Sequence, residues 1–190
     1  MNKENALAFL RKNQPCPSDW EMPDGLMQEY DSVLKYFLSH PDKECVPLFL
    51  NSFGDGDGWG VYVMVEPLIE KFMPEDVVPH LACALIVGPK SVRYWCAQIA
   101  SAFPSTDLIA PLCECLKDNN SGVREFAAFA ISRIQERDSL MILRNHLNVE
   151  ANEEIRNLIF HVLMERGSLI AAQGTVEDKS EPQPTDKPNE

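Results

Sequence analysis

Apolar residues recur along this chain with the three-and-four spacing of amphipathic helices, and short polar segments separate them. In residues 109–116, apolar side chains stand at positions i, i+3, i+4 and i+7. A polar turn follows at residues 117–122, and helical spacing resumes in residues 123–134. Ser121 is the residue type that favours a helix N-cap. This stretch therefore predicts two antiparallel helices joined by a turn.

The helix pair repeats along the chain with one period, which two markers share. A proline recurs in the first helix and a hydrophobic-arginine pair recurs in the second. The prolines are Pro47, Pro79 and Pro111, and the pairs are Val92-Arg93, Val123-Arg124 and Ile155-Arg156. A single helix pair cannot bury its apolar face alone, so repeats of this length stack. We predict an all-α fold, a right-handed α-solenoid of stacked antiparallel helix pairs.

These residues resemble the HEAT-repeat family. The resemblance rests on the proline in the first helix, the turn aspartate Asp118, the Val-Arg pair and the alanines that follow it. It implies four HEAT-like or ARM-like repeats within residues 44–167, with bounds at 44–74, 75–106, 107–138 and 139–167. The first repeat departs from the pattern because Tyr62 stands in place of the arginine. The last repeat departs from it because Leu143 replaces the proline.

The segments outside the repeats are expected to cap the stack and to extend from it. Residues 1–13 and 24–40 have amphipathic spacing, so residues 1–43 are predicted to form N-terminal capping helices. Residues 173–190 are rich in proline and charge and contain no aromatic residue. Such a composition buries too little apolar surface to offset its ordering entropy, so we predict a disordered acidic tail.

The composition narrows the function classes. A net charge of -12 and a pI near 4.7 oppose binding to nucleic acid, but they favour a basic protein partner. Six cysteines without a CxxC pair fit reduced thiols, and we find no signal peptide or membrane span. We expect a cytoplasmic protein that is monomeric when free. The sequence carries no nucleotide-binding or catalytic motif, and no metal or cofactor is predicted.

A glycine-rich acidic loop at residues 54–60 interrupts the first repeat. Asp55, Asp57, Gly60 and Glu66 match four positions of a calcium-binding loop, but Trp59 replaces a ligand, and the repeat pattern places Glu66 on a helix. We therefore favour an exposed acidic turn that contacts a basic partner. The candidate contact residues here are Asp55, Asp57, Trp59, Tyr62 and Glu66.

A second group of candidates lies on the predicted second helices of the two central repeats: Tyr94, Trp95, Gln98, Glu125 and Phe129. Met64, Trp95, Phe126 and Leu158 align in one column by repeat register. Two interpretations remain open for this column. It forms an apolar ridge on the concave face, which solenoids use for binding, or it packs between neighbouring repeats.

We interpret the chain as a non-enzymatic protein-binding solenoid. Its size, charge and repeat type resemble the HEAT-like immunity proteins of bacterial polymorphic and contact-dependent toxin systems. That resemblance implies tight binding of a basic toxin domain. An adaptor or scaffold of a larger complex is the alternative, as is an enzyme accessory of the lyase type. A HEAT-like DNA glycosylase would need a cationic groove, which the charge opposes.

Overall fold

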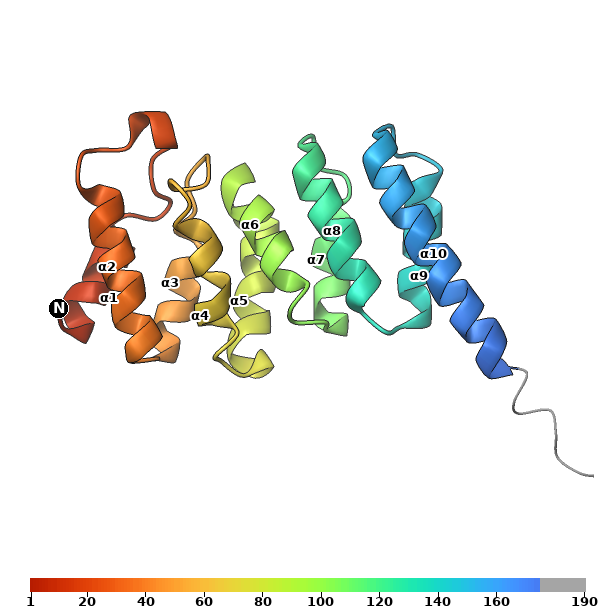
Figure 1. Cartoon of the computed structure of the whole chain (residues 1–190), viewed down its shortest axis with the longest axis horizontal. Coiled ribbons are helices and arrows are strands. Elements are labelled where there is room, and N and C mark those ends of the chain that lie inside the picture. Colours follow the sequence, from red (N-terminus) through yellow and green to blue (C-terminus); the bar gives the residue numbers. More distant parts are fainter. Residues whose placement is uncertain (175–190) are drawn as a thin grey trace, which may run out of the picture.

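The computed structural model describes residues 1–174, and the regular elements of this range are all helical (Figure 1). Four short 3-10 turns accompany the α-helices: η1 Asp19–Glu21, η2 Lys43–Cys45, η3 Tyr62–Met64 and η4 Thr106–Leu108. The α-helices are α1 Lys3–Lys12, α2 Leu26–Ser39, α3 Val46–Leu50, α4 Glu66–Ile69, α5 Pro74–Val87, α6 Lys90–Ala100, α7 Ile109–Cys115, α8 Ser121–Arg133, α9 Arg137–Leu147 and α10 Glu153–Gly174.

The helices form two layers, with the odd-numbered helices in one and the even-numbered helices in the other (Figure 1). Consecutive helices pair across the layers, as α5 does with α6 and α7 with α8. Within each layer, helices of neighbouring pairs are in contact, as α3 is with α5 and α6 with α8. One continuous apolar core runs between the layers. The predicted α-solenoid is therefore confirmed.

The N-terminal helices form a helix pair of their own at one end of the stack. Helix α1 contacts α3, and α2 contacts α4. Tyr30 of α2 lies at the centre of this packing. Its ring meets Phe49 edge-on, with centroids 5.7 Å apart, and its hydroxyl lies 2.6 Å from the Ser52 hydroxyl. The pair thereby covers aromatic side chains that the first repeat would otherwise expose to water.

The first residues of α5 and α8 show how the local sequence determines where these helices begin. Helix α5 begins at Pro74, so the repeat proline Pro79 lies inside the helix, in its second turn. Asn120, not Ser121, is the N-cap of α8. Its backbone is extended and its side-chain oxygen accepts a hydrogen bond from the Val123 amide at 3.1 Å. The prediction of Ser121 as the cap was wrong by one residue.

The second helix of the first repeat is divided in two. A 3-10 turn at Tyr62–Met64 precedes the four-residue α4, Glu66–Ile69. Pro67 lies in the first turn of α4 and has no amide hydrogen to donate to the preceding turn, which favours the start of a new helix at this point. The residues preceding the 3-10 turn form the long 54–60 loop instead.

The last helix, α10, extends further than its counterparts and ends at Gly174. It therefore reaches two residues into the segment predicted as a tail, residues 173–190. The rest of that predicted tail, residues 175–190, lies outside the described residues.

Candidate functional site

The 54–60 loop is held in place by the segment that joins α1 to α2. The Asp19 carboxylate accepts hydrogen bonds from the backbone amides of Asp57 and Gly58, at 3.0 and 3.1 Å. The Asp19 amide in turn donates to the Asp55 carbonyl at 2.9 Å. The loop is thus attached to a segment 35 to 40 residues earlier in the chain, and its backbone shape is set before any ligand binds.

Two buried aromatic residues form hydrogen bonds with the backbone of the loop. Tyr62 is 1% exposed, and its hydroxyl accepts a hydrogen bond from the Gly54 amide at 3.0 Å. Trp95 is 6% exposed and donates its indole N–H to the Gly56 carbonyl at 3.2 Å. Both rings pack on Phe53. The prediction that Tyr62 and Trp95 contact a partner was therefore wrong, because both side chains are enclosed and bind the loop.

Asp57 and Trp59 are the exposed side chains of this loop. Trp59 is 54% exposed and has a φ of 54°, a left-handed conformation that few non-glycine residues adopt. In the described part of the chain it is the one non-glycine residue with positive φ. Beside it lies a small pocket of about 190 Å³ lined by Met27, Gln28, Asp31, Trp59 and Val61. This volume suits a single side chain better than a cofactor, whose sites usually measure ~300–1,000 Å³.

A second and larger hollow lies between the loop and the start of α6. Its volume is about 330 Å³, and its lining includes Asp55, Asp57, Tyr94 and Asn120. Lys90 at the start of α6 forms an ion pair with Asp55 at 2.8 Å. Since Asp55 is neutralised in this way, Asp57 carries the acidic character of the hollow.

The remaining candidates do not converge on the loop. Glu66 begins α4 and accepts a hydrogen bond from Gln98 of α6 at 3.2 Å, so these two half-buried side chains join neighbouring repeats. Glu125 and Phe129 belong to α8 and line neither hollow. Glu125 is half-buried and Phe129 is exposed.

The column of residues predicted from the repeat register, Met64, Trp95, Phe126 and Leu158, serves mainly for packing. Trp95 is buried, while Phe126 and Leu158 are half-buried. Tyr94, although not a member of the column, meets Phe126 edge-on with ring centroids 5.0 Å apart, and this contact joins α6 to α8. Met64, at the end of the column in the first repeat, is the exposed member. The packing interpretation of the column therefore holds for its central members.

The geometry of the loop does not form a calcium site. Asp55 is paired with Lys90, and Glu66 is bound to Gln98 across a repeat boundary. Within residues 1–174, no group of three or more histidine, cysteine, aspartate or glutamate side chains is arranged to hold a metal ion. No helix in the same range is long and apolar enough to cross a membrane.

The cysteines lie mainly in the core. Cys16, Cys45, Cys96 and Cys115 are buried, and Cys83 is exposed. Burial raises the pKa of Cys16 to about 11 and the pKa of Cys45 to about 12. A thiol with a raised pKa is a poor nucleophile at neutral pH, so these buried cysteines are packing residues.

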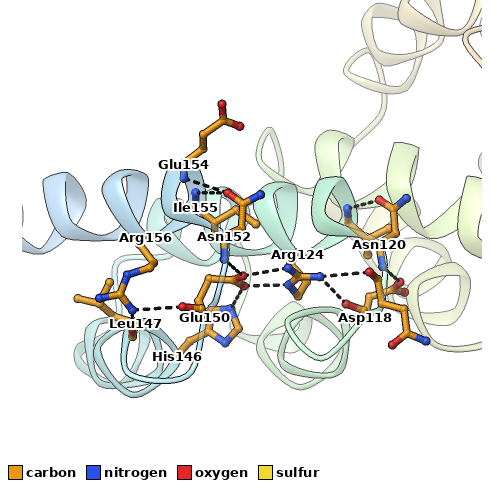
Figure 2. Close-up of polar contacts among 12 residues, drawn as sticks. Asp118, Asn120, Arg124, His146, Leu147, Glu150, Asn152, Glu154, Ile155 and Arg156 are labelled. Carbon is orange, nitrogen blue, oxygen red and sulfur yellow. Dashed lines mark hydrogen bonds and ion pairs between the residues drawn. The ribbon is translucent and has the colours of Figure 1, made fainter.

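The arginines of the repeat motif form a series of equivalent contacts along the turns. Arg93 pairs with Asp118 of the following turn at 2.6 Å. In the same way, Arg124 pairs with Glu150 of the next turn at 2.8 Å, as Figure 2 shows. Each arginine also donates a hydrogen bond to a backbone carbonyl in the turn that precedes its own helix: Arg93 to Gly88, and Arg124 to Asp118. We call each such arginine–carboxylate pair a rung. The arginine of the hydrophobic-arginine pair, which revealed the repeat in the sequence, therefore links each repeat to the next.

The sequence did not reveal Asp19 or Lys90 as residues that organise the loop. Asp19 falls in an irregular segment, and its partners lie near residue 57, a separation that no local pattern encodes. The role of Lys90 depends on the register between the first two repeats. The available signal was indirect: the loop is unusually rich in glycine, and glycine allows a close approach of other groups to the backbone.

The fold and the contacts between turns define the class of this protein as an α-solenoid of paired helices. In the comparison with protein families, residues 74–164 match the HEAT repeats family. This segment runs from α5 into α10, and the first helix pairs lie outside it. The comparison with curated proteins found no match. Over the matched segment, the chain is thus similar to HEAT repeats, which serve as scaffolds for protein interaction.

Proposed function

We propose that this protein binds a basic protein partner through the surface formed by Asp31, Asp57 and Trp59, which we call the acidic loop surface. Asp57 and Trp59 come from the 54–60 loop, and Asp31 comes from the facing turn of α2. An aromatic ring next to carboxylates suits a lysine or arginine side chain, which gains both cation–π and ionic contacts. The pocket beside Trp59 has room for one such side chain.

The observation that carries the proposal is the conformation of Trp59. A large aromatic residue at positive φ costs ~1 kcal/mol or more relative to glycine or asparagine, and here more than half of its side chain is exposed to water. Burial therefore does not account for its presence. Exposed tryptophans on a preset backbone are characteristic of binding hot spots.

Charge supports a basic partner. No lysine or arginine occurs between residues 44 and 70, or between residues 13 and 34. These two segments supply the acidic loop surface and the segment that carries Asp19. Asp31 is paired with Lys35 of its own helix and Asp55 with Lys90, whereas Asp57 forms no ion pair among the described residues. Asp57 therefore supplies the unpaired negative charge that a positively charged partner would meet on this surface.

The specific form of the proposal is an immunity protein that neutralises a basic toxin domain by stoichiometric binding. Net acidity, a preset loop and an exposed aromatic anchor are what such a protein requires for fast and tight association. An adaptor in a larger complex would use the same surface and would differ in the partner alone.

The proposal is tested by capturing partners with the full chain from cells that naturally produce it, followed by binding measurements with the purified partner. Trp59→Asn is expected to weaken binding at least ~10-fold, as loss of a hot-spot side chain does. Asparagine tolerates positive φ, so the thermal unfolding midpoint should not fall. Asp57→Asn is expected to weaken binding less, because it removes one charge.

Glu75→Gln is the matched control, because Glu75 is an exposed carboxylate on α5 and lies outside the acidic loop surface. It should leave binding unchanged. An acidic partner, or unchanged affinity of Trp59→Asn, would refute the proposed surface. A captured toxin whose activity is lost at a one-to-one ratio supports the immunity function, whereas captured subunits of a stable complex favour the adaptor.

A further inference from the structure

The C-terminal end of the solenoid contains an incomplete rung. Arg93 and Arg124 each use one terminal nitrogen for a carbonyl of their own turn and direct the remaining nitrogens to a carboxylate of the next turn. Arg156 is the third arginine of the series. Its Nη1 donates to the Leu147 and Glu150 carbonyls at 2.7 and 3.2 Å, which is the contact with its own turn (Figure 2).

The other half of this rung is absent within the described chain. Arg156 has no carboxylate partner among residues 1–174, and its side chain is exposed, whereas Arg93 and Arg124 are covered by the next repeat. The Nε and second terminal nitrogen of Arg156 make no hydrogen bond among the described residues, and these are the nitrogens that Arg124 directs to Glu150. The exposed guanidinium thus keeps the two donors that match a carboxylate.

The apolar position beside Arg156 also lacks the cover that its counterparts have in the earlier repeats. Ala97 of α6 and Ala128 of α8 are both 0% exposed, and the residue at their register position in α10 is Phe160, which is 52% exposed. Phe160 lies one helical turn after Arg156, so the two side chains share a face of α10. Terminal repeats of soluble solenoids usually present a polar outer face, and this one presents an aromatic ring.

We propose that this end of the solenoid, defined by Arg156 and Phe160, docks an acidic helical segment of another protein. The segment continues the stack by presenting a carboxylate to Arg156, as Glu150 does to Arg124, and an apolar surface to Phe160. Charge complementarity and continuity with the interface between repeats identify this occupant. The inference goes beyond the proposed function because this surface lies at the opposite end from the acidic loop surface and selects the opposite charge.

The test uses the full chain with the photo-crosslinking residue p-benzoylphenylalanine in place of Phe160, in extracts of the producing cells. Crosslinked peptides are identified by mass spectrometry. The expected product is a helical segment of another protein that contains aspartate or glutamate. Arg156→Gln should reduce its yield at least fivefold, because glutamine can still bind the turn carbonyls but cannot form the ion pair.

Arg144→Gln is the control, because Arg144 is an exposed arginine of α9 that takes no part in a rung. It should leave the yield unchanged, and thermal unfolding should verify that both variants are folded. Crosslinks to a second copy of this chain, to its own residues 175–190, or to a segment without carboxylates would overturn the proposal. So would the absence of any crosslink, or equal yields from the Arg156→Gln variant and the unsubstituted protein.

Discussion

At the scale of single residues, the 54–60 loop depends on backbone conformations that glycine allows. Gly56 has a φ of 121°, and a Cβ added there would lie 2.1 Å from an Asp19 carboxylate oxygen. Gly60 has a φ of 83° but open space around the corresponding position. A side chain added at Gly60 would therefore cost only backbone strain, whereas one added at Gly56 would cost the same strain and would also have to displace Asp19.

We predict that Gly56→Ala destabilises the protein by ~2–4 kcal/mol, because it adds a steric clash to the strain of positive φ. Gly60→Ala should cost only ~1 kcal/mol, since strain alone applies. Urea unfolding of both variants measures the difference. Equal costs would mean that Asp19 moves aside freely and does not hold the loop.

The sequence identified this loop through its composition but not through its contacts. The alternation of glycine with acidic residues and tryptophan singled out Asp57 and Trp59, both of which are exposed. The same reasoning included Tyr62 and Trp95 as contact residues, and both are buried. Burial of an aromatic side chain depends on what the fold places above it, and the repeat pattern contains no information about a loop that folds back over its own repeat.

At the scale of elements, the rungs join each helix pair to the next through charges that are removed from water. The Glu150 side chain is 1% exposed and the Arg124 side chain is 18% exposed. Glu150 also accepts hydrogen bonds from the Asn152 amide at 2.8 Å and lies 3.0 Å from a ring nitrogen of His146. A carboxylate with this degree of burial is stable only while its partners remain in place.

Loss of Arg124 should therefore cost more than an isolated ion pair contributes. We predict that Arg124→Met destabilises the protein by ~3–5 kcal/mol, because it leaves Glu150 buried and unpaired. The double variant Arg124→Met/Glu150→Gln should recover ~1–3 kcal/mol relative to the sum of the single variants. The exposed pair Glu114–Lys117 is the control and should show no measurable coupling in the same cycle. Additive effects at the rung would contradict this account.

The rung also predicts a dependence on pH. The hydrogen bonds from Arg124, and then from the Asn152 amide, lower the pKa of Glu150 to about 2 from its ordinary value near 4.5. Because the pKa is lower in the folded state, the stabilisation is fully present above pH ~5 and is lost as the pH falls toward 2. In urea titrations, the stability of Glu150→Gln should change less than that of the unsubstituted protein over this range. Parallel pH curves would show that the carboxylate is not stabilised by the fold.

The sequence predicted most elements, because the helical period is local information. The proline and Val-Arg markers placed the helix pairs α5–α6 and α7–α8 correctly, and apolar spacing located α1 and α2. The role of the marker arginine was not predictable in the same way. Its partner stands about 25 residues later and differs between repeats, as Asp118 in one case and Glu150 in the other.

At the scale of the whole molecule, the two ends of the solenoid differ in chemistry. The first helix pairs carry the acidic loop surface, in segments that contain no lysine or arginine over residues 13–34 and 44–70. The last helix pair presents Arg156 with an incomplete rung and the exposed Phe160. If both proposed surfaces bind as described above, the solenoid holds two different proteins along one axis. An adaptor requires such an arrangement, whereas the immunity function does not.

Salt dependence distinguishes steering by the acidic loop surface from the effect of net charge alone. Exposed charges are screened over ~10 Å at 0.1 M salt and ~3 Å at 1 M, so the association rate of a basic partner should fall at least ~10-fold between these conditions, with a much smaller change in dissociation. Stopped-flow measurements on Asp57→Asn and Glu75→Gln, which remove the same charge, separate the two effects. If the partner approaches the loop, only Asp57→Asn lowers the low-salt rate, and the curves converge at high salt. Equal losses in both variants would mean that the net charge of -12 attracts the partner without directing it to this surface.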